Sequence, residues 1–252
     1  MTRTTISRPC FRPSLIAFAA SMLALTLATS PLFAQVGVAE REGRAMRIGL
    51  IGAGTMGGPI GLLWADAGHQ ILFSSRNPGE LMDLVQSAAP RASAGYADAA
   101  AFFGEVVLLA VPPVAIPQLG EDFGHLMQGK VVIDISNPRL DREGPITEEW
   151  LAMGTGLAMA QYLPGVRLVK AFNILSSRML RNPINESGEK IGVAIAGDDD
   201  EAVAIVANLV RDAGFDPVIV GPLAEASQFD RGSPVWLEGM SAQEIRETLN
   251  IR

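Results

Sequence analysis

The chain has 252 residues, of which 48% are hydrophobic and 19% charged, a globular composition that excludes an intrinsically disordered chain. The formal net charge of −7 argues against a nucleic-acid partner, because neutralising phosphates requires a basic surface. The length allows one large domain, or one domain with a small second one.

The N-terminal segment has the three parts of a secretory signal peptide. Arg3, Arg8 and Arg12 precede an apolar core over 15–28, and small residues lead to a cleavage point at Ala34–Gln35. The core is shorter than the roughly 20 residues that span a bilayer, so no stable membrane insertion is expected after cleavage. We therefore predict a signal peptide over 1–34 and a linker over 35–45. Cys10, the only cysteine, would leave with the signal, which excludes disulfides and thiolate metal sites from the mature chain.

The alternative is a cytoplasmic protein whose translation starts at Met46, directly before the first expected strand. An exported, periplasmic protein should have a mature N-terminus between Ser30 and Val36. N-terminal sequencing of protein from the native host tests this prediction, and a chain that starts at Met46 would contradict it.

From Met46 on, short apolar runs alternate with longer amphipathic segments. The apolar runs are mostly continuous, as expected for strands covered on both faces. We predict strands over 47–51, 70–73, 106–110, 131–135, 168–171, 192–196 and 217–220. We predict helices over 56–67, 79–88, 97–103, 114–127 and 201–213. This alternation predicts an α/β fold with a Rossmann-type, doubly wound parallel sheet.

A glycine motif follows the first expected strand. Gly52, Gly54 and Gly57 form the pattern G-x-G-x-x-G between this strand and the first expected helix. In such a motif the first glycine permits a tight turn, the second lets a pyrophosphate approach the backbone, and the third lets helix and strand pack closely. Thr55 and Met56 lie within the motif, where helix-start amides meet the anion. The motif in this context predicts a dinucleotide site.

The end of the second expected strand indicates which dinucleotide binds. Sites that prefer NAD usually place an Asp or Glu there, whereas this chain has Ser75 and Arg76. A guanidinium forms charge-assisted hydrogen bonds with a 2′-phosphate, so the sequence favours NADP(H). The alternative is that both residues are ordinary solvated turn residues.

Three more loops follow expected strands, at the edge where open α/β sheets bind ligands. They carry Val111 with Pro112, Asn137 with Pro138, and Phe172 with Asn173. The alternative for each loop is that these residues only form the turn and bind no ligand. No Ser/His/Asp arrangement or metal-ligand spacing emerges, so we assign no catalytic acid or base and no metal ligand.

Together these segments resemble the family of coenzyme F420-dependent NADP reductases, whose nucleotide domain recurs in pyrroline-5-carboxylate reductases and membrane ferric reductases. The resemblance rests on IGAGTMGGPIG, SSRNP, LLAVPP, VVIDISNP, LVKAFNIL, AIAGDDDEA and VGPLAEA, and runs from about Met46 to Trp236. It implies an oxidoreductase that transfers hydride between NADPH and a small-molecule acceptor resembling F420 or a flavin, in a direction that the sequence leaves open. Positioning and exclusion of water would then do most of the work.

The resemblance also implies roles for single residues. The pyrophosphate would lie along Gly52, Gly54, Thr55 and Met56, and the 2′-phosphate against Ser75 and Arg76. The nicotinamide would lie near Val111 and Pro112, with Asn137 on the cofactor side and Phe172 and Asn173 on the acceptor side. We expect the NADP-binding domain over 46–180 and a small C-terminal extension on the acceptor side over 181–252. The oligomeric state stays open, a homodimer included.

Two other functions compete with this interpretation. A β-hydroxyacid dehydrogenase would use Lys170 and Asn173 as its catalytic pair, but that chemistry requires a lysine on a long helix, and Lys170 lies in a strand-like run. A protein that binds NADP(H) without turnover is the other alternative. The resemblance does not assign the segment 226–236 to the binding of an acceptor.

Overall fold

The computed structural model describes residue 2 and residues 44–251. Contacts within the chain group Glu42–Arg252 into one compact unit. The expected signal peptide except residue 2, and the expected linker except residues 44 and 45, lie outside the described residues. Within the part of the chain that is described, no helix has the length and apolarity needed to cross a membrane.

One eight-stranded sheet forms the centre of the unit, in the order β3-β2-β1-β4-β5-β6-β7-β8. The strands are β1 (Arg47–Ile51), β2 (Gln70–Ser74), β3 (Ala92–Gly95), β4 (Val106–Leu109), β5 (Val131–Asp134), β6 (Arg167–Lys170), β7 (Gly192–Gly197) and β8 (Asp216–Gly221). The first six follow the strand order of a dinucleotide-binding sheet. The predicted Rossmann-type fold is therefore confirmed.

The sheet is mostly parallel, as predicted, with one antiparallel strand pair. β7 pairs antiparallel with β6 and parallel with β8, whereas the other neighbours are parallel. All seven predicted strands are present, and the sequence missed only β3. The boundary expected between residues 180 and 181 falls inside helix α9, and β7 and β8 extend the same sheet.

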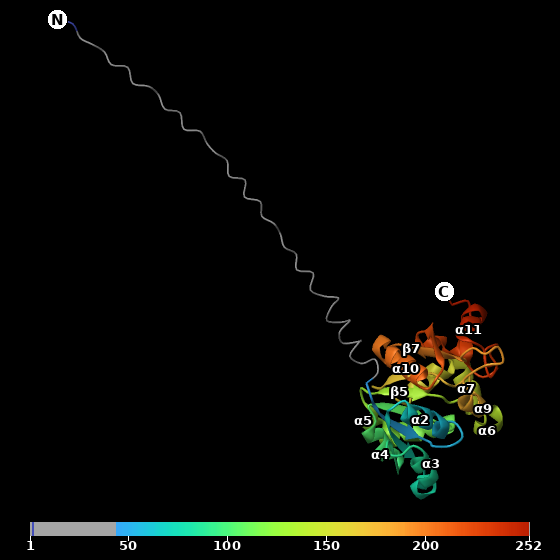
Figure 1. Ribbon diagram of the computed structural model, residues 1–252. Coiled ribbons are helices and arrows are strands. Elements are labelled where there is room, and N and C mark those ends of the chain that lie inside the picture. The colour runs from blue at the N-terminus through green and yellow to red at the C-terminus, as the bar shows by residue number, and fades with distance from the viewer. Residues whose placement is uncertain (1, 3–43, 252) are drawn as a thin grey trace. The chain divides into compact units, whose positions relative to one another are not determined.

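Helices connect the strands and cover both faces of the sheet (Figure 1). They are α2 (Gly57–Asp66), α3 (Met82–Ser87), α4 (Ala97–Phe103), α5 (Ile116–Met127), α6 (Leu140–Glu143), α7 (Ile146–Met153), α8 (Thr155–Ala160), α9 (Ser177–Arg181), α10 (Asp200–Asp212) and α11 (Ala242–Thr248). Short 3-10 turns are η1 (Pro78–Leu81), η2 (Pro113–Ala115) and η3 (Leu223–Phe229). The sequence predicted α2, α3, α4, α5 and α10, and missed the other helices.

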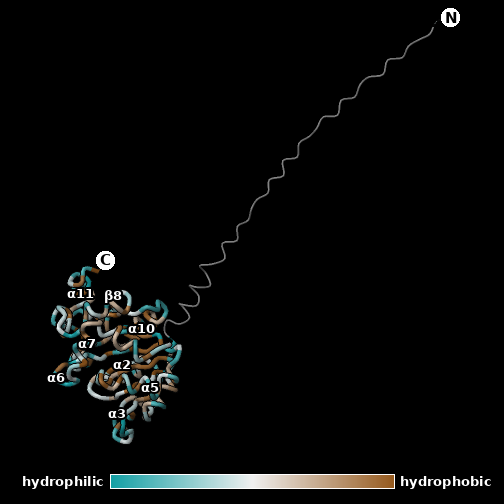
Figure 2. The backbone as a smooth tube through the Cα atoms, turned by 180° about the vertical axis from the view of Figure 1, so that it is seen from behind, coloured by the Kyte–Doolittle hydropathy of each residue, from teal (hydrophilic) through white to brown (hydrophobic). Residues whose placement is uncertain are grey.

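The core has two layers because alternate strand residues point to opposite faces of the sheet. One layer packs strand residues such as Ile48 and Val106 against α2 and α10. The other packs Val107 and Val132 against α4, α5, α7 and α8. Figure 2 shows apolar backbone segments concentrated inside the unit and hydrophilic ones on its outer loops. Burial on both faces explains the continuous apolar runs of the central strands.

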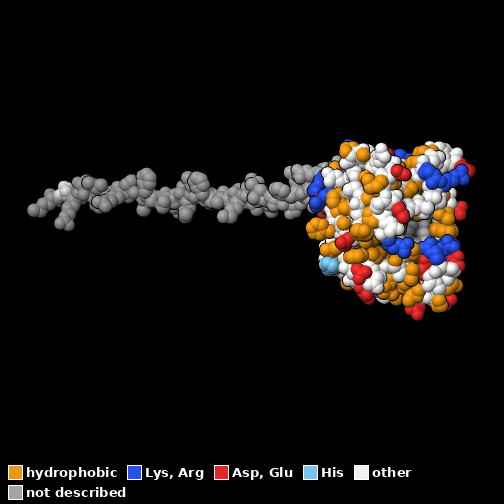
Figure 3. Space-filling view, turned by 90° about the horizontal axis from the view of Figure 1, so that it is seen from below, with side chains coloured by type: hydrophobic (Ala, Val, Ile, Leu, Met, Phe, Trp, Pro, Cys, Tyr) orange, Lys and Arg blue, Asp and Glu red, His pale blue; other side chains and the backbone are white. Residues whose placement is uncertain are grey.

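The surface carries charges of both signs. On the face shown in Figure 3, Lys and Arg side chains alternate with Asp and Glu, and apolar side chains lie between them. No broad area of that face is uniformly basic, in keeping with the net negative composition.

Candidate functional site

The glycine loop lies between β1 and α2, at the point where the sheet order reverses from β1 to β4. Gly52 has a φ of +103°, and a Cβ there would lie 2.5 Å from the carbonyl oxygen of Ala110. A Cβ on Gly57 would collide with the carbonyl of Gly52. A Cβ on Gly54 meets no protein atom within 4 Å. The first and third glycines are therefore required by packing, whereas the second faces open space that a ligand can occupy.

The loop leaves hydrogen-bond donors free at the start of α2. The Ala53 amide donates to the carbonyl of Ser74, but those of Gly54, Thr55 and Met56 have no acceptor among the described residues. The first turn of α2 contains no acidic residue. Free amides at the positive end of a ten-residue helix form a site for an anion such as a pyrophosphate.

The turn after β2 places a cation at the same edge of the sheet. Ser75 Oγ accepts a hydrogen bond of 3.0 Å from the Asn77 amide, which fixes the turn and leaves the Ser75 hydroxyl hydrogen free to donate. Arg76 is exposed and forms no ion pair with a described residue. Its guanidinium is therefore available to a phosphate.

A cavity of about 780 Å³ joins these parts. Its lining brings together six of the residues that the sequence analysis assigned to the cofactor: Gly52, Gly54, Ser75, Arg76, Val111 and Pro112. Thr55, Met56 and Gly57 continue the same loop into α2, although they do not line the cavity. A volume of this size fits a small-molecule or cofactor site.

Sequence analysis missed several residues that line this cavity. Tyr96, 61% exposed, follows β3, and Asp98 lies in the first turn of α4. Phe123 contributes from α5, and Glu80 brings a second carboxylate. The signal for Tyr96 would have been an aromatic residue just after a strand, but β3 itself was not recognised.

A buried ion pair supports the carboxyl ends of β5 and β6. Lys170 Nζ donates to Asp134 Oδ2 at 2.8 Å and to the carbonyl of Ser136 at 2.5 Å, and both charged side chains are fully buried. Asp134 Oδ1 also accepts a hydrogen bond from the Ser136 amide at 2.8 Å. The pair therefore fixes the loop after β5. This burial contradicts the alternative in which Lys170 acts on a hydroxyacid, because its ammonium has no access to a substrate.

Asn137 and Asn173 lie side by side at these strand ends. Asn137 Nδ2 donates to the carbonyl of Asn173 at 2.7 Å, and Asn173 Nδ2 donates to the carbonyl of Phe229 at 3.1 Å. Their Oδ1 atoms and the hydroxyl of Ser136 are buried without a protein partner among the described residues. Buried polar atoms normally have partners, so this edge can accept hydrogen bonds from a ligand or water.

The side chain of Phe172, which the sequence analysis placed on the acceptor side, lies in the core. Phe172 has a φ of +61°, is fully buried, and packs edge-on against Trp64 and Phe215 at centroid distances of 5.8 and 6.4 Å. The left-handed backbone turns the ring into the core between the sheet and α2. The next residue, Asn173, lies at the polar edge beside Asn137.

Asp230 lies close to this edge, at the end of η3. It accepts hydrogen bonds from the hydroxyl and the amide of Thr155. Burial raises the pKa of Asp230 above its ordinary value, although the Lys170 charge and the Thr155 hydrogen bonds act in the opposite direction. Asp230 therefore anchors the segment that continues to Arg231.

Comparisons with known proteins identify similar sequences and similar folds. Residues 47–138 match the family model of coenzyme F420-dependent NADP oxidoreductases. The rat (Rattus norvegicus) metalloreductase STEAP3 is 27% identical over 207 residues, which are 79% of this chain and 39% of that protein. The chain therefore spans about two fifths of this relative's length.

Two solved structures show the same fold. A hypothetical protein from Sinorhizobium meliloti has a TM-score of 0.63 and 24% identity, covering 79% of this chain and 96% of its own. A proposed F420-dependent NADP reductase from an Arthrobacter species has a TM-score of 0.61 and 23% identity, covering 73% and 88%. The resemblance to this reductase family is confirmed over residues 47–138.

Proposed function

We propose that this relative of the coenzyme F420-dependent NADP oxidoreductases binds NADPH at the carboxyl ends of β1, β2 and β4 and reduces a flavin-like or deazaflavin-like acceptor beside β5 and β6. The observation that carries the proposal is the open space in front of Gly54, which continues to Arg76 within one cavity. The metalloreductase name of the rat relative leaves the acceptor of this chain open, because the chain spans only part of that relative.

Each part of the cavity fits one part of the nucleotide. The free amides of the glycine loop suit the pyrophosphate, and Arg76 with the Ser75 hydroxyl suits the 2′-phosphate. Val111 and Pro112 provide an apolar wall for the nicotinamide ring, next to the polar edge formed by Asn137 and Asn173. Ring and acceptor would then meet above β4 and β5, which are neighbours in the sheet.

The protein's contribution is positioning. The glycine loop and Arg76 would hold NADPH, which would supply the hydride, and the acceptor would take this hydride together with a proton from solvent. Lys170 is buried in its ion pair with Asp134, so it holds the loop after β5 and moves no proton to substrate. Holding two rings in contact and excluding water are sufficient to accelerate such a transfer.

Arg76 should determine the preference for NADPH over NADH. We expect the protein to bind NADPH more tightly by about tenfold or more, which corresponds to roughly 1.4 kcal/mol. Arg76→Ala should remove most of this preference and leave NADH affinity nearly unchanged, because only the 2′-phosphate contacts the guanidinium. Titration calorimetry with both nucleotides measures the two affinities.

Arg91→Ala is the matched control. Arg91 is also exposed, but it lies directly before β3, at the amino end of that strand, and does not line the cavity. An equal loss of affinity for NADPH and NADH in Arg76→Ala would show that Arg76 does not recognise the phosphate.

A further inference from the structure

A second cavity, of about 650 Å³, lies beyond the carboxyl end of β5. Two segments far apart in the sequence form most of it: residues 138–141, at the start of α6, and residues 231–236, after η3. Leu151 of α7 completes the lining. The segment after η3 belongs to the part of the sequence to which the motifs assign no role.

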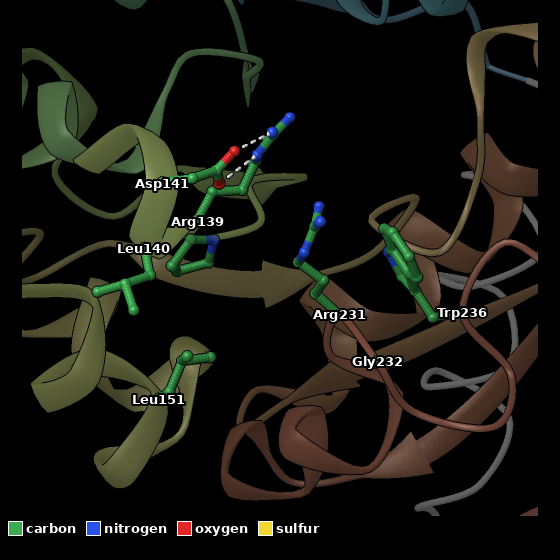
Figure 4. A pocket seen from close by; sticks show the side chains of 8 residues that line it. Arg139, Leu140, Asp141, Leu151, Arg231, Gly232 and Trp236 are labelled. Carbon is green, nitrogen blue, oxygen red and sulfur yellow. Dashed lines mark hydrogen bonds and ion pairs between the residues drawn. The ribbon is translucent and has the colours of Figure 1, made fainter. Parts of the chain in front are cut away.

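The walls of the cavity combine apolar surface with a stacked cation. Leu140 and Leu151 lie on one side, and Trp236 lies on the other (Figure 4). Pro138 adds to the apolar lining. The Arg231 guanidinium is 4.8 Å from the centroid of the Trp236 ring. Trp236 Nε1 is buried and has no acceptor among the described residues. An indole that lines a cavity and lacks an acceptor suits a flat ligand with a carbonyl oxygen.

The charges in the cavity leave one cation free. Arg139 binds Asp141 through two hydrogen bonds, Nε to Oδ1 at 3.1 Å and Nη2 to Oδ2 at 2.5 Å. The hydrogen bond from Arg139 holds the pKa of Asp141 below its ordinary value. Arg231, drawn between this pair and Trp236 in Figure 4, forms no ion pair at 4 Å or less with a described residue. The lining therefore has a net charge of +1 and offers Arg231 to an anion.

The position of the cavity connects it to the nucleotide site. Pro138 directly follows Asn137, whose side chain binds the carbonyl of Asn173 at the polar edge. β5 is the neighbour of β4, which leads to Val111 and Pro112 in the nucleotide cavity. A ligand that extends from the second cavity toward Asn137 would thus approach the expected nicotinamide position.

We propose that this cavity binds the acceptor through its anionic side chain: Trp236 stacks on a planar heteroaromatic compound, and Arg231 binds its phosphate or carboxylate. The inference rests on the proposed function, since it places the acceptor of that same reaction. A bare metal cation fits poorly, because the lining is net positive and no group of three or more His, Cys, Asp or Glu gathers anywhere within residues 44–251. The class of acceptor is a phosphorylated flavin or a deazaflavin with an acidic tail.

Three fluorescent probes test the proposal. FMN and coenzyme F420 carry anionic groups, whereas riboflavin has the same ring as FMN without the phosphate. Their affinities are measured by titration of the NADP⁺-loaded protein, and NADPH affinity is measured separately. Arg231→Gln should weaken FMN and F420 binding by about tenfold or more, as expected for a lost charge-assisted contact, and change riboflavin binding by less than about threefold.

Variants at Trp236 test the stacking. Trp236→Leu should weaken all three probes, and Trp236→Phe should restore most of the loss because it keeps an aromatic face. Arg246→Gln, at an exposed arginine of α11, is the matched control and should change none of the affinities. Thermal unfolding of each variant shows that the fold is retained.

The outcomes separate this inference from the proposed function. If the protein binds NADPH but the affinities for FMN and F420 are the same in wild type, Arg231→Gln and Trp236→Leu, the acceptor cavity is refuted and the nucleotide site stands. Failure of the wild type to bind FMN and F420 at millimolar concentration also refutes the cavity. Failure to bind NADPH refutes the proposed function itself.

Discussion

Gly54→Val should abolish NADPH binding and leave the protein folded. A Cβ at Gly54 meets no protein atom within 4 Å, and the backbone there is not in the left-handed region, so valine adds no strain to the fold. Its two methyl groups would occupy the space in front of the free amides of the loop, where the pyrophosphate is expected. We expect the dissociation constant to rise by about 100-fold or more, which corresponds to roughly 2.7 kcal/mol.

Calorimetric titration with NADPH measures the loss, and circular dichroism with thermal unfolding measures the fold. Gly54→Ala, with one methyl group, should give an intermediate loss. Gly52→Ala is the contrasting variant: its φ of +103° and the close Ala110 carbonyl should make it unstable. A folded Gly54→Val that keeps wild-type affinity would refute the dinucleotide motif.

Asp134→Ala should be the most destabilising single substitution at the polar edge. It leaves the fully buried Lys170 ammonium without its carboxylate and removes the acceptor of the Ser136 amide. Removing one partner of a buried ion pair typically costs about 3–5 kcal/mol, because the remaining charge stays uncompensated. Urea unfolding should therefore show a much lower midpoint with little change in slope.

The double substitution Asp134→Leu with Lys170→Met should recover most of this loss, since a buried pair can often be replaced by apolar side chains at little cost. Glu105→Ala is the control for an exposed pair. Glu105 contacts Arg44 and Arg47 at the surface, and its loss should cost less than about 1 kcal/mol. If Asp134→Ala lowers the free energy of unfolding by no more than Glu105→Ala does, the buried pair does not stabilise the fold.

The sequence predicts most of the fold because the central strands are buried on both faces. Val106–Leu109 and residues 131–133 are continuous aliphatic runs, and such runs are typical of a covered parallel sheet. β3 escaped prediction because its sequence, ASAG, has no β-branched or aromatic residue. The antiparallel direction of β7 could not be read, because an apolar strand has the same composition in either direction. Helices α6, α7 and α8 are too short to show a helical period, and Gly144 and Gly154 interrupt them.

The sequence predicts those parts of the site that strand ends and loop backbone form. It does not predict the parts that depend on tertiary packing. Gly52, Gly54, Arg76 and Pro112 meet in one cavity because consecutive strand ends lie at one edge of the sheet. The position of Phe172 at a strand end was readable, but its left-handed φ, which turns the ring into the core, was not. Arg231 and the 138–141 loop line one cavity although they lie about ninety residues apart in the sequence, and no local sequence pattern predicts this.

Transfer of deuterium from labelled NADPH tests the central claim most directly. The protein is mixed without oxygen with NADPH carrying deuterium at both C4 positions of the nicotinamide ring, and with coenzyme F420 or FMN. The absorbance of the nicotinamide and of the acceptor is followed together. The account predicts that both bands fall in equal molar amounts with a primary isotope effect, and that deuterium is found at C5 of reduced F420, since the corresponding position of FMN exchanges with water. Loss of neither band, in protein shown to bind NADPH, would contradict the account and favour a protein that binds the nucleotide without turnover.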